Sequence, residues 1–143
     1  MEANRWIPTE HKRLNPKQLA FLTCEILEVL YGGAAGGGKS EALLAAALQY
    51  AEVPGYAALI LMRTYPELSM PKAAMHRAAE WLRGTGARWI DDGKTWRFPE
   101  GGSLTFGYLE HEDDRFRYRT AEFQFIAFDE LVAFSEMQYT FLF

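Results

Sequence analysis

Gly33-Ala34-Ala35-Gly36-Gly37-Gly38-Lys39-Ser40 is the stretch that decides the fold, because it matches the pattern G-x-x-x-x-G-K-[ST] without a gap. Glycines lack a Cβ atom, so the backbone of such a loop can take positive φ values and turn its N–H groups toward an anion. In this pattern the lysine ammonium reaches the β- and γ-phosphates, and the serine hydroxyl contacts Mg²⁺. All eight residues are therefore candidates for binding ATP, with Lys39 also catalytic and Ser40 also a metal ligand.

Both flanks of the loop support this interpretation. Glu25–Tyr31 is short, rich in large apolar residues and followed by a double glycine, which is typical of a buried strand that enters a tight turn. From about Ser40 to Ala51 apolar residues recur at helical spacing, and Pro54-Gly55 ends the pattern. A helix that begins at the loop would point the positive end of its dipole at a bound phosphate. The alternative is a glycine-rich turn in which Lys39-Ser40 is accidental.

A second apolar run, Phe123–Phe128, ends in two carboxylates, Asp129 and Glu130. A parallel strand covered on both faces is apolar throughout, and its carboxyl end is where open α/β sheets bind ligands. Asp129 is thus a candidate Mg²⁺ ligand, and Glu130 is a candidate catalytic residue that orients or deprotonates the attacking water. Carboxylates at a strand end are otherwise ordinary solvated residues, so the functional interpretation depends on the loop.

Three stretches together, Tyr31–Glu41, Leu61–Leu68 and Ala121–Glu130, resemble the ATPase part of the large terminase subunit of tailed bacteriophages. The resemblance runs in order from about Asn15 to Phe143. It implies a P-loop NTPase of the additional-strand, catalytic-glutamate type, with a parallel α/β sheet flanked by helices. The activity implied is hydrolysis of ATP with Mg²⁺ to drive viral double-stranded DNA into a procapsid. Many relatives carry an arginine in the loop at the place of Ala35.

The resemblance also implies partners and a location. The partners are viral double-stranded DNA, the portal protein and the small terminase subunit, and the complete protein forms a ring of identical copies. The location is the cytoplasm of an infected or lysogenic bacterial host, with no membrane association. Two other functions stay open: a non-catalytic truncated remnant that binds but does not turn over ATP, and another P-loop ATPase such as a helicase-like nucleic-acid remodeller.

Two further site residues depend on the resemblance. Gln18 lies in a segment similar to the family's adenine-recognition segment, and its amide can both donate to and accept from the adenine edge. Arg63 follows the expected strand Tyr56–Met62 and is the candidate for sensing or stabilising the γ-phosphate, a catalytic role. From the residues alone, Gln18 on a helix Lys17–Leu22 is an ordinary surface residue, and Arg63 pairs with Glu67 or caps the sheet edge.

The remaining elements complete a βαβα order that is typical of a parallel sheet. A second helix is expected around Pro66–Leu82, interrupted near Pro71, and an antiparallel meander is expected between Ala87 and Leu109. The aromatic side chains of the meander are expected to pack in the core instead of stacking on bases. They are Trp89, Trp96, Phe98 and Phe106.

The carboxyl end leads to an expectation about the sheet. In the ATPase class that the chain resembles, one more strand follows the strand that ends in the two carboxylates (the Walker B strand, here Phe123–Phe128). That additional strand lies between the Walker B strand and the strand that enters the phosphate loop (here Glu25–Tyr31). Only Leu131–Phe143 follows Glu130 in this chain. We therefore expect a truncated ATPase domain over 1–143, with 1–24 on the adenine side, 25–143 as the core and no nuclease domain. The gap would close by direct pairing of the two strands, recruit another chain, or leave the fragment loosely folded.

Composition limits the other possibilities. The net charge of −4 argues against a domain that mainly clamps DNA, because such a domain needs a basic surface. Arg115, Arg117 and Arg119 alternate with aromatic residues as in a nucleic-acid contact, but the adjacent acidic residues favour local pairing. The single Cys24 is expected to be a buried structural thiol, and the three scattered histidines show no metal-ligand spacing.

Overall fold

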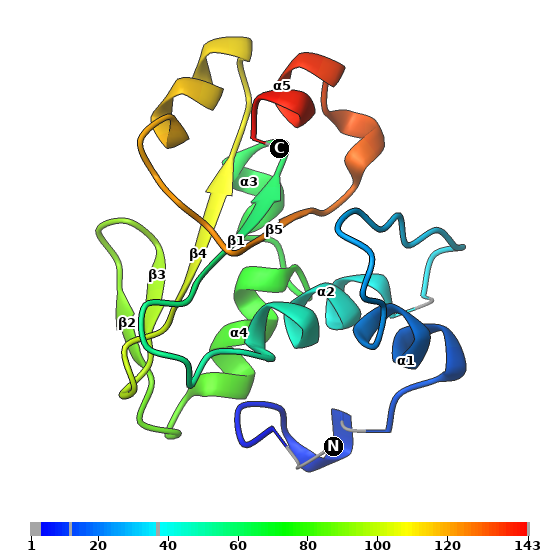
Figure 1. The fold of residues 1–143 in the computed structure, drawn as a ribbon, viewed down its shortest axis with the longest axis vertical. Coiled ribbons are helices and arrows are strands. Elements are labelled where there is room, and N and C mark those ends of the chain that lie inside the picture. The colour runs from blue at the N-terminus through cyan, green and yellow to red at the C-terminus, as the bar shows by residue number, and fades with distance from the viewer. Residues whose placement is uncertain (1–3, 12, 37, 143) are drawn as a thin grey trace.

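The computed structural model describes residues 4–11, 13–36 and 38–142, and it has a mixed α/β fold. In this described part, five strands form one sheet in the order β2-β3-β4-β1-β5 (Figure 1). Strand β1 pairs in parallel with β4 and β5, while β2, β3 and β4 form an antiparallel meander. The bounds are β1 (Ala57–Met62), β2 (Arg88–Ile90), β3 (Thr95–Arg97), β4 (Ser103–Tyr108) and β5 (Phe125–Phe128).

Short helices connect and cover these strands. The α-helices are α1 (Pro16–Leu22), α2 (Lys39–Leu48), α3 (Tyr65–Leu68), α4 (Ala74–Leu82) and α5 (Glu136–Phe141). The 3₁₀ helices are η1 (Thr9–His11), η2 (Glu112–Tyr118) and η3 (Leu131–Ala133). The expected break near Pro71 is confirmed, since α3 and α4 are separate helices. Within the described ranges, none of the helices has the length and apolar character needed to cross a bilayer.

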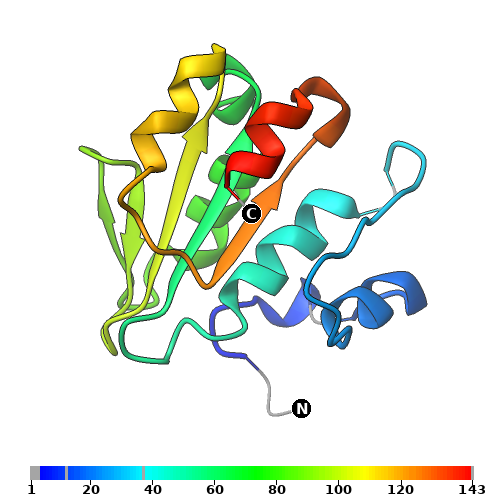
Figure 2. The same cartoon turned by 45° about the horizontal axis from the view of Figure 1, so that its top comes forward.

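The two faces of β1 belong to two different hydrophobic cores. Successive side chains of a strand point to opposite faces, so Ala58 and Ile60 join the larger core with α2 and α4. Leu59 and Leu61 join a smaller core beneath η2 and α5, together with Leu109. Figure 2 shows η2 and α5 side by side over one face of the sheet. Coverage of both faces explains why this strand is apolar at every position.

In the part of the chain that the structure describes, three α-helices begin with a reciprocal capping box, in which the cap side chain accepts from a backbone N–H and the residue three positions later bonds back. These caps fix where α1, α3 and α5 start, and α1 and α3 also have proline in the first turn. The helices thus start where local sequence satisfies their free N–H groups. The pairs are Asn15–Gln18, Thr64–Glu67 and Ser135–Gln138.

The expectation of a strand at Glu25–Tyr31 is wrong. These residues have no strand assignment, and the side chains of Leu27 and Leu30 are 93% and 77% exposed. Figure 2 draws this segment as a loop outside the sheet. A strand requires a neighbour that supplies hydrogen-bond partners, and in the described part of the chain β5 pairs with β1 alone. Direct pairing of the phosphate-loop segment with β5 is therefore wrong as well.

Two expectations about burial have opposite outcomes. Trp96, Phe98 and Phe106 are buried in the larger core, and Trp89 packs against Trp96 with its ring centroid 5.4 Å away, so core packing of the meander aromatics is confirmed. The buried thiol is wrong, because Cys24 is exposed. Cys24 lies just before Glu25–Tyr31, the segment outside the sheet, where apolar sequence does not lead to burial.

Candidate functional site

The loop before α2 takes backbone conformations that favour glycine. Gly36 and Gly38 have φ values of 79° and 73°, in the left-handed region, whereas Gly37 lies outside the described residues. Gly38 is the residue before the first turn of α2, and a Cβ atom there would lie 2.4 Å from Nε2 of Gln18. The turn into α2 and the close approach of α1 therefore both depend on a missing side chain at this position.

A hollow of about 220 Å³ lies in this loop. Pockets that enclose a whole small-molecule ligand usually have about 300–1,000 Å³, so this hollow is suited to a small polar group such as a phosphate. Two cationic side chains, Lys17 and Lys39, contribute to its wall, which suits an anion. The wall consists of Lys17, Tyr31, Gly32, Gly33, Ala34, Ala35, Gly36 and Lys39.

Lys39 folds back over the loop that precedes it. Its Nζ donates to the carbonyl oxygens of Gly33, at 2.8 Å, and Ala34, at 3.0 Å. An ammonium group has three N–H donors, so two bonds to carbonyls leave one donor for an anion. The position of the ammonium next to the hollow is what the loop pattern predicts for its lysine.

Ser40 and Asp129, separated by 89 positions in the sequence, meet in the structure. The hydroxyl of Ser40 donates to Oδ2 of Asp129 at 2.8 Å, which joins the start of α2 to the end of β5. The side chain of Asp129 is buried, and its backbone N–H donates to the carbonyl of Leu61 in β1 at 2.9 Å. The fold therefore places the hydroxyl and the carboxylate that the sequence selects at one point on the carboxyl edge of the sheet.

Glu130 is the other carboxylate of this edge, and it differs from Asp129 in exposure. Glu130 is exposed and has a φ of 55°, an uncommon value for a residue with a side chain. Its backbone N–H donates to Oδ1 of Asp129 at 3.1 Å, and its carbonyl accepts from Ala133 at the end of η3. This left-handed turn holds one carboxylate inside the site and leaves its neighbour in solvent.

Gln18 lies beside the loop, but its amide already has protein partners. The side chain is 6% exposed, its Oε1 accepts from the N–H of Asn15, and its Nε2 donates to the carbonyl of Gly38 at 3.1 Å. Gln18 thus ties α1 to Gly38, the residue just before α2. The adenine role stays a prediction, and it would require this amide to exchange its partners.

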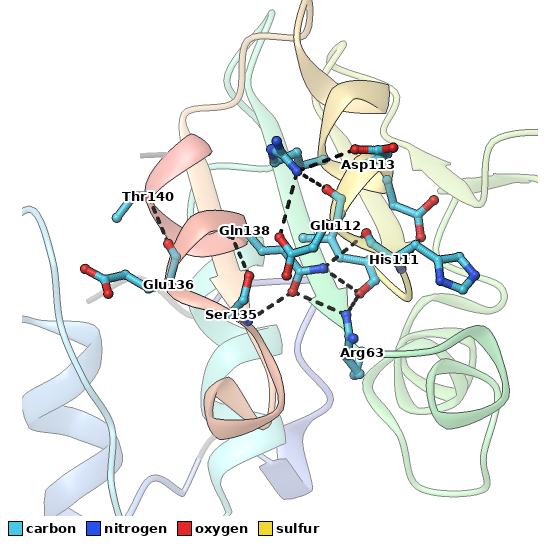
Figure 3. A network of polar contacts seen from close by, with 11 residues as sticks. Arg63, His111, Glu112, Asp113, Ser135, Glu136, Gln138 and Thr140 are labelled. Carbon is cyan, nitrogen blue, oxygen red and sulfur yellow. Dashed lines mark hydrogen bonds and ion pairs between the residues drawn. The ribbon is translucent and has the colours of Figure 1, made fainter.

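Arg63 follows β1, and its guanidinium also has protein partners (Figure 3). It donates to the carbonyl of Leu109 and, at 3.3 Å, to Oε1 of Gln138. Glu67 forms the capping box of α3. In this conformation Arg63 bonds to the loop after β4, as expected for a residue that caps the sheet edge, and its role toward a γ-phosphate stays a prediction.

The arginines of η2 are mostly engaged locally. Arg117 lies 3.4 Å from a carboxylate oxygen of Asp114 and stacks on Tyr108 with its guanidinium 4.8 Å from the ring centroid. Arg115 lies 3.8 Å from a carboxylate oxygen of Glu112. Local pairing of these two arginines is therefore confirmed, and Arg119 is exposed.

Two residues of the site region were missed in the sequence. Lys17 lines the hollow, and its position next to Gln18 on α1 is the signal that could have indicated it. Gln138 contacts Arg63 from α5, and the pattern Ser135-x-x-Gln138, a capping box, is the signal that places it near a helix start. Neither side chain belongs to a motif that carries chemistry by itself, so only the fold connects them to the site.

Comparison with known proteins identifies a family. A family model described as terminase large subunit, T4likevirus-type, N-terminal, matches residues 30–142. This range includes the whole loop Gly33–Ser40, the start of α2 and both carboxylates after β5. Searches among curated proteins and among solved structures found no match.

Proposed function

Because the chain belongs to the family of T4likevirus-type terminase large subunits, whose N-terminal part matches residues 30–142, we propose that it binds ATP with Mg²⁺ at the loop Gly33–Ser40. Membership supports a role in viral DNA packaging. Hydrolysis of the bound ATP would supply the free energy for moving DNA. Viral double-stranded DNA and the portal protein are the partners that such a role requires, and the small terminase subunit and a ring of copies belong to the same proposal.

The observation that carries the proposal is the contact between Ser40 and Asp129, whose side-chain oxygens are 2.8 Å apart. A hydroxyl after the loop lysine and a carboxylate at the end of a neighbouring strand are the two protein ligands that P-loop NTPases offer to Mg²⁺. Their meeting across 89 positions is not required by helix or strand formation, and it supports a common ligand for both side chains.

The residues of the site fit Mg²⁺ and the phosphates of ATP. Mg²⁺ prefers oxygen ligands and keeps part of its water shell, so a serine hydroxyl and one carboxylate are a suitable donor set. When bound, Mg²⁺ neutralises charge on the phosphates. The ammonium of Lys39 and the backbone N–H groups of the loop would bind the phosphate oxygens, in a hollow whose size suits a phosphate. Glu130 carries the second carboxylate, in solvent and next to the first.

Glu130 is the residue that we propose for the water step. Its carboxylate would accept a hydrogen bond from the attacking water and take its proton as the water oxygen bonds to the γ-phosphorus, while the bond from this phosphorus to the bridging oxygen breaks and ADP leaves. The exposed position after the left-handed turn lets the carboxylate reach a water molecule, whereas the buried Asp129 is held by Ser40. The two adjacent carboxylates thus have different environments, which supports different roles.

Binding without turnover is the second candidate. The observation that favours it is the position of Glu25–Tyr31, which enters the loop from outside the sheet instead of from a paired strand. A loop whose entering segment is not paired in the sheet can bind phosphates, but it positions them less rigidly for reaction. A helicase-like function has no such observation in its favour.

Titration of labelled ATP in the presence of Mg²⁺ tests binding. We expect Lys39→Ala to weaken binding by at least about tenfold, because hydrogen bonds to charged groups contribute about 1.5–3 kcal/mol. Lys72→Ala is the matched control, since it removes the same charge from an exposed site between α3 and α4. Equal affinities of the Lys39→Ala variant and the wild type would refute the assigned loop.

Steady-state phosphate release separates the two candidates. Release that disappears in Glu130→Gln, while ATP binding is kept, would establish turnover and exclude the binding-only function. Absence of release from the wild type in the presence of DNA would favour binding alone.

A further inference from the structure

Gln138 is a buried polar residue with no role in the site described above. Three polar or charged side chains are buried in the described part of the chain, and two of them, Gln18 and Asp129, belong to the candidate site. The third, Gln138, lies on α5 and is 0% exposed. A buried polar group costs free energy unless it forms hydrogen bonds, so the partners of this amide indicate what it does.

The amide of Gln138 uses both of its ends. Its Nε2 donates to the carbonyl of Leu109 at 3.0 Å and to the carbonyl of His111 at 3.2 Å. Its Oε1 accepts from the N–H of Ser135 at 3.1 Å and from Arg63 at 3.3 Å. An amide has two donors and two main acceptor positions, and here all four are used. Figure 3 shows Gln138 between Arg63, His111 and Ser135.

These partners belong to the segments that follow the three parallel strands. Arg63 follows β1, Leu109 and His111 follow β4, and Ser135 closes the turn that follows β5. The carboxyl ends of parallel strands lie at one edge of a sheet, which is also the edge that carries Asp129 and Glu130. One side chain therefore joins all three connections at the edge where the site lies.

The turn between Glu130 and Ser135 is held at both ends. At its start the N–H of Glu130 donates to Asp129, and within it Ala133 donates to the carbonyl of Glu130 at 2.9 Å. Phe134 packs on Phe128 of β5 with a ring-centroid distance of 5.1 Å. At its end Gln138 fixes Ser135. A displacement of Glu130 would consequently strain the bonds of Gln138.

The same amide reaches the arginine-bearing η2. Its bond to the carbonyl of His111 holds the residue that precedes η2, and α5 packs against η2 through Phe141 and Phe116, with ring centroids 5.5 Å apart. An apolar side chain could fill the same volume, but it would not fix three backbone segments in one geometry, as directional hydrogen bonds do.

We propose that Gln138 is a positioning residue. Its buried amide ties the Glu130 turn to Arg63 and to the loop that starts η2, so that binding of nucleotide with Mg²⁺ beside Asp129 and Glu130 slows backbone hydrogen exchange in η2. This inference rests on the proposed nucleotide site. It assigns to Gln138 no contact with nucleotide. It also gives Arg63 a defined partner on α5.

Hydrogen–deuterium exchange with Mg²⁺ and a non-hydrolysable ATP analogue tests the proposal. In the wild type we expect the analogue to slow exchange in three segments: the loop 33–40, the turn and helix 130–142, and the segment 109–119. In Gln138→Met, which keeps the length of the side chain but none of its amide bonds, we expect slower exchange in the loop alone. Affinity for the analogue should stay within about twofold of the wild type, because Gln138 lies outside the loop.

Gln124→Met is the matched control. Gln124 also bonds to the backbone of β1, where its Oε1 accepts from the N–H of Ala57 at 2.7 Å, but at the amino end of the sheet. We expect this variant to respond to the analogue like the wild type in all three segments. If Gln138→Met does not fold, Gln138→Asn replaces it, because this variant keeps the amide but shortens its reach by one methylene.

The outcomes are distinguishable. The proposal is overturned if Gln138→Met responds like the wild type in all three segments, or if the wild type responds in the loop alone. Failure of the nucleotide site itself has a different signature, namely no response of the loop in the wild type. Where the wild type hydrolyses ATP, we expect turnover of Gln138→Met to fall by about tenfold to a hundredfold at unchanged nucleotide affinity, because small displacements of reacting groups have effects of this size.

Discussion

Replacement of Gly38 by alanine is the sharpest test of how α1 is fitted to the loop. Gly38 has a φ of 73°, and a Cβ atom there would lie 2.4 Å from Nε2 of Gln18. Ordinary contacts begin at 3.4 Å, so the amide would have to move by about 1 Å. That movement would break its bond to the carbonyl of Gly38, which is 3.1 Å long in the structure.

The expected loss of stability has two parts. A left-handed conformation costs a residue with a side chain about 1–2 kcal/mol relative to glycine. Loss of the Gln18 bond costs a further 0.5–1.5 kcal/mol, approximately. We therefore expect Gly38→Ala to lower the free energy of unfolding by about 1.5–3.5 kcal/mol.

Urea unfolding followed by tryptophan fluorescence measures this loss. The part of the loss that comes from the Gln18 bond should disappear when Gln18 is also replaced. Gly38→Ala and Gln18→Ala should therefore show an interaction free energy of about 0.5–1.5 kcal/mol in a double-mutant cycle. Gln49→Ala is the control for additivity, because Gln49 also joins α2 to α1, through the carbonyl of Leu22, but at the other end of α2. A loss below about 0.5 kcal/mol for Gly38→Ala, or strict additivity with Gln18→Ala, would refute the described fit.

Two further predictions concern Glu25–Tyr31, the segment that lies outside the sheet. Leu27→Asp should change the free energy of unfolding by less than about 0.5 kcal/mol, because Leu27 is 93% exposed. Leu59→Ala in the buried core should cost about 2–5 kcal/mol in the same urea experiment. A large loss for Leu27→Asp would mean that this segment is buried. Burial and the neighbouring carboxylate of Glu28, to which its hydroxyl donates, raise the pKa of Tyr139 to about 12. The stabilisation from that contact should therefore be complete below about pH 10 and lost as the pH rises through 12. In an ultraviolet absorbance titration, the tyrosine ionisation near pH 12 should disappear in Tyr139→Phe. An ionisation step that persists in this variant would contradict the assignment to Tyr139.

The sequence by itself determined the elements whose signals are local. Pro16, Thr64 and Ser135 mark helix starts because a proline or a capping side chain acts within one turn. The apolar runs Tyr56–Met62 and Phe123–Phe128 predicted the strands β1 and β5, and these strands form because each has a strand beside it. The loop pattern and the two carboxylates were also visible as candidates, since their residue types and order carry the chemistry.

Tertiary structure alone decided which of those signals became contacts. Glu25–Tyr31 has the composition of a strand, but strand formation depends on backbone partners that composition does not supply, so it lies outside the sheet with Leu27 in solvent. The meeting of Ser40 with Asp129, and the bonds of Gln138 to the connections after β1 and β4, join residues that are far apart in the chain. Such pairs depend on how the parallel strands align at one edge, and that alignment is a property of the whole sheet, which no single stretch of sequence contains.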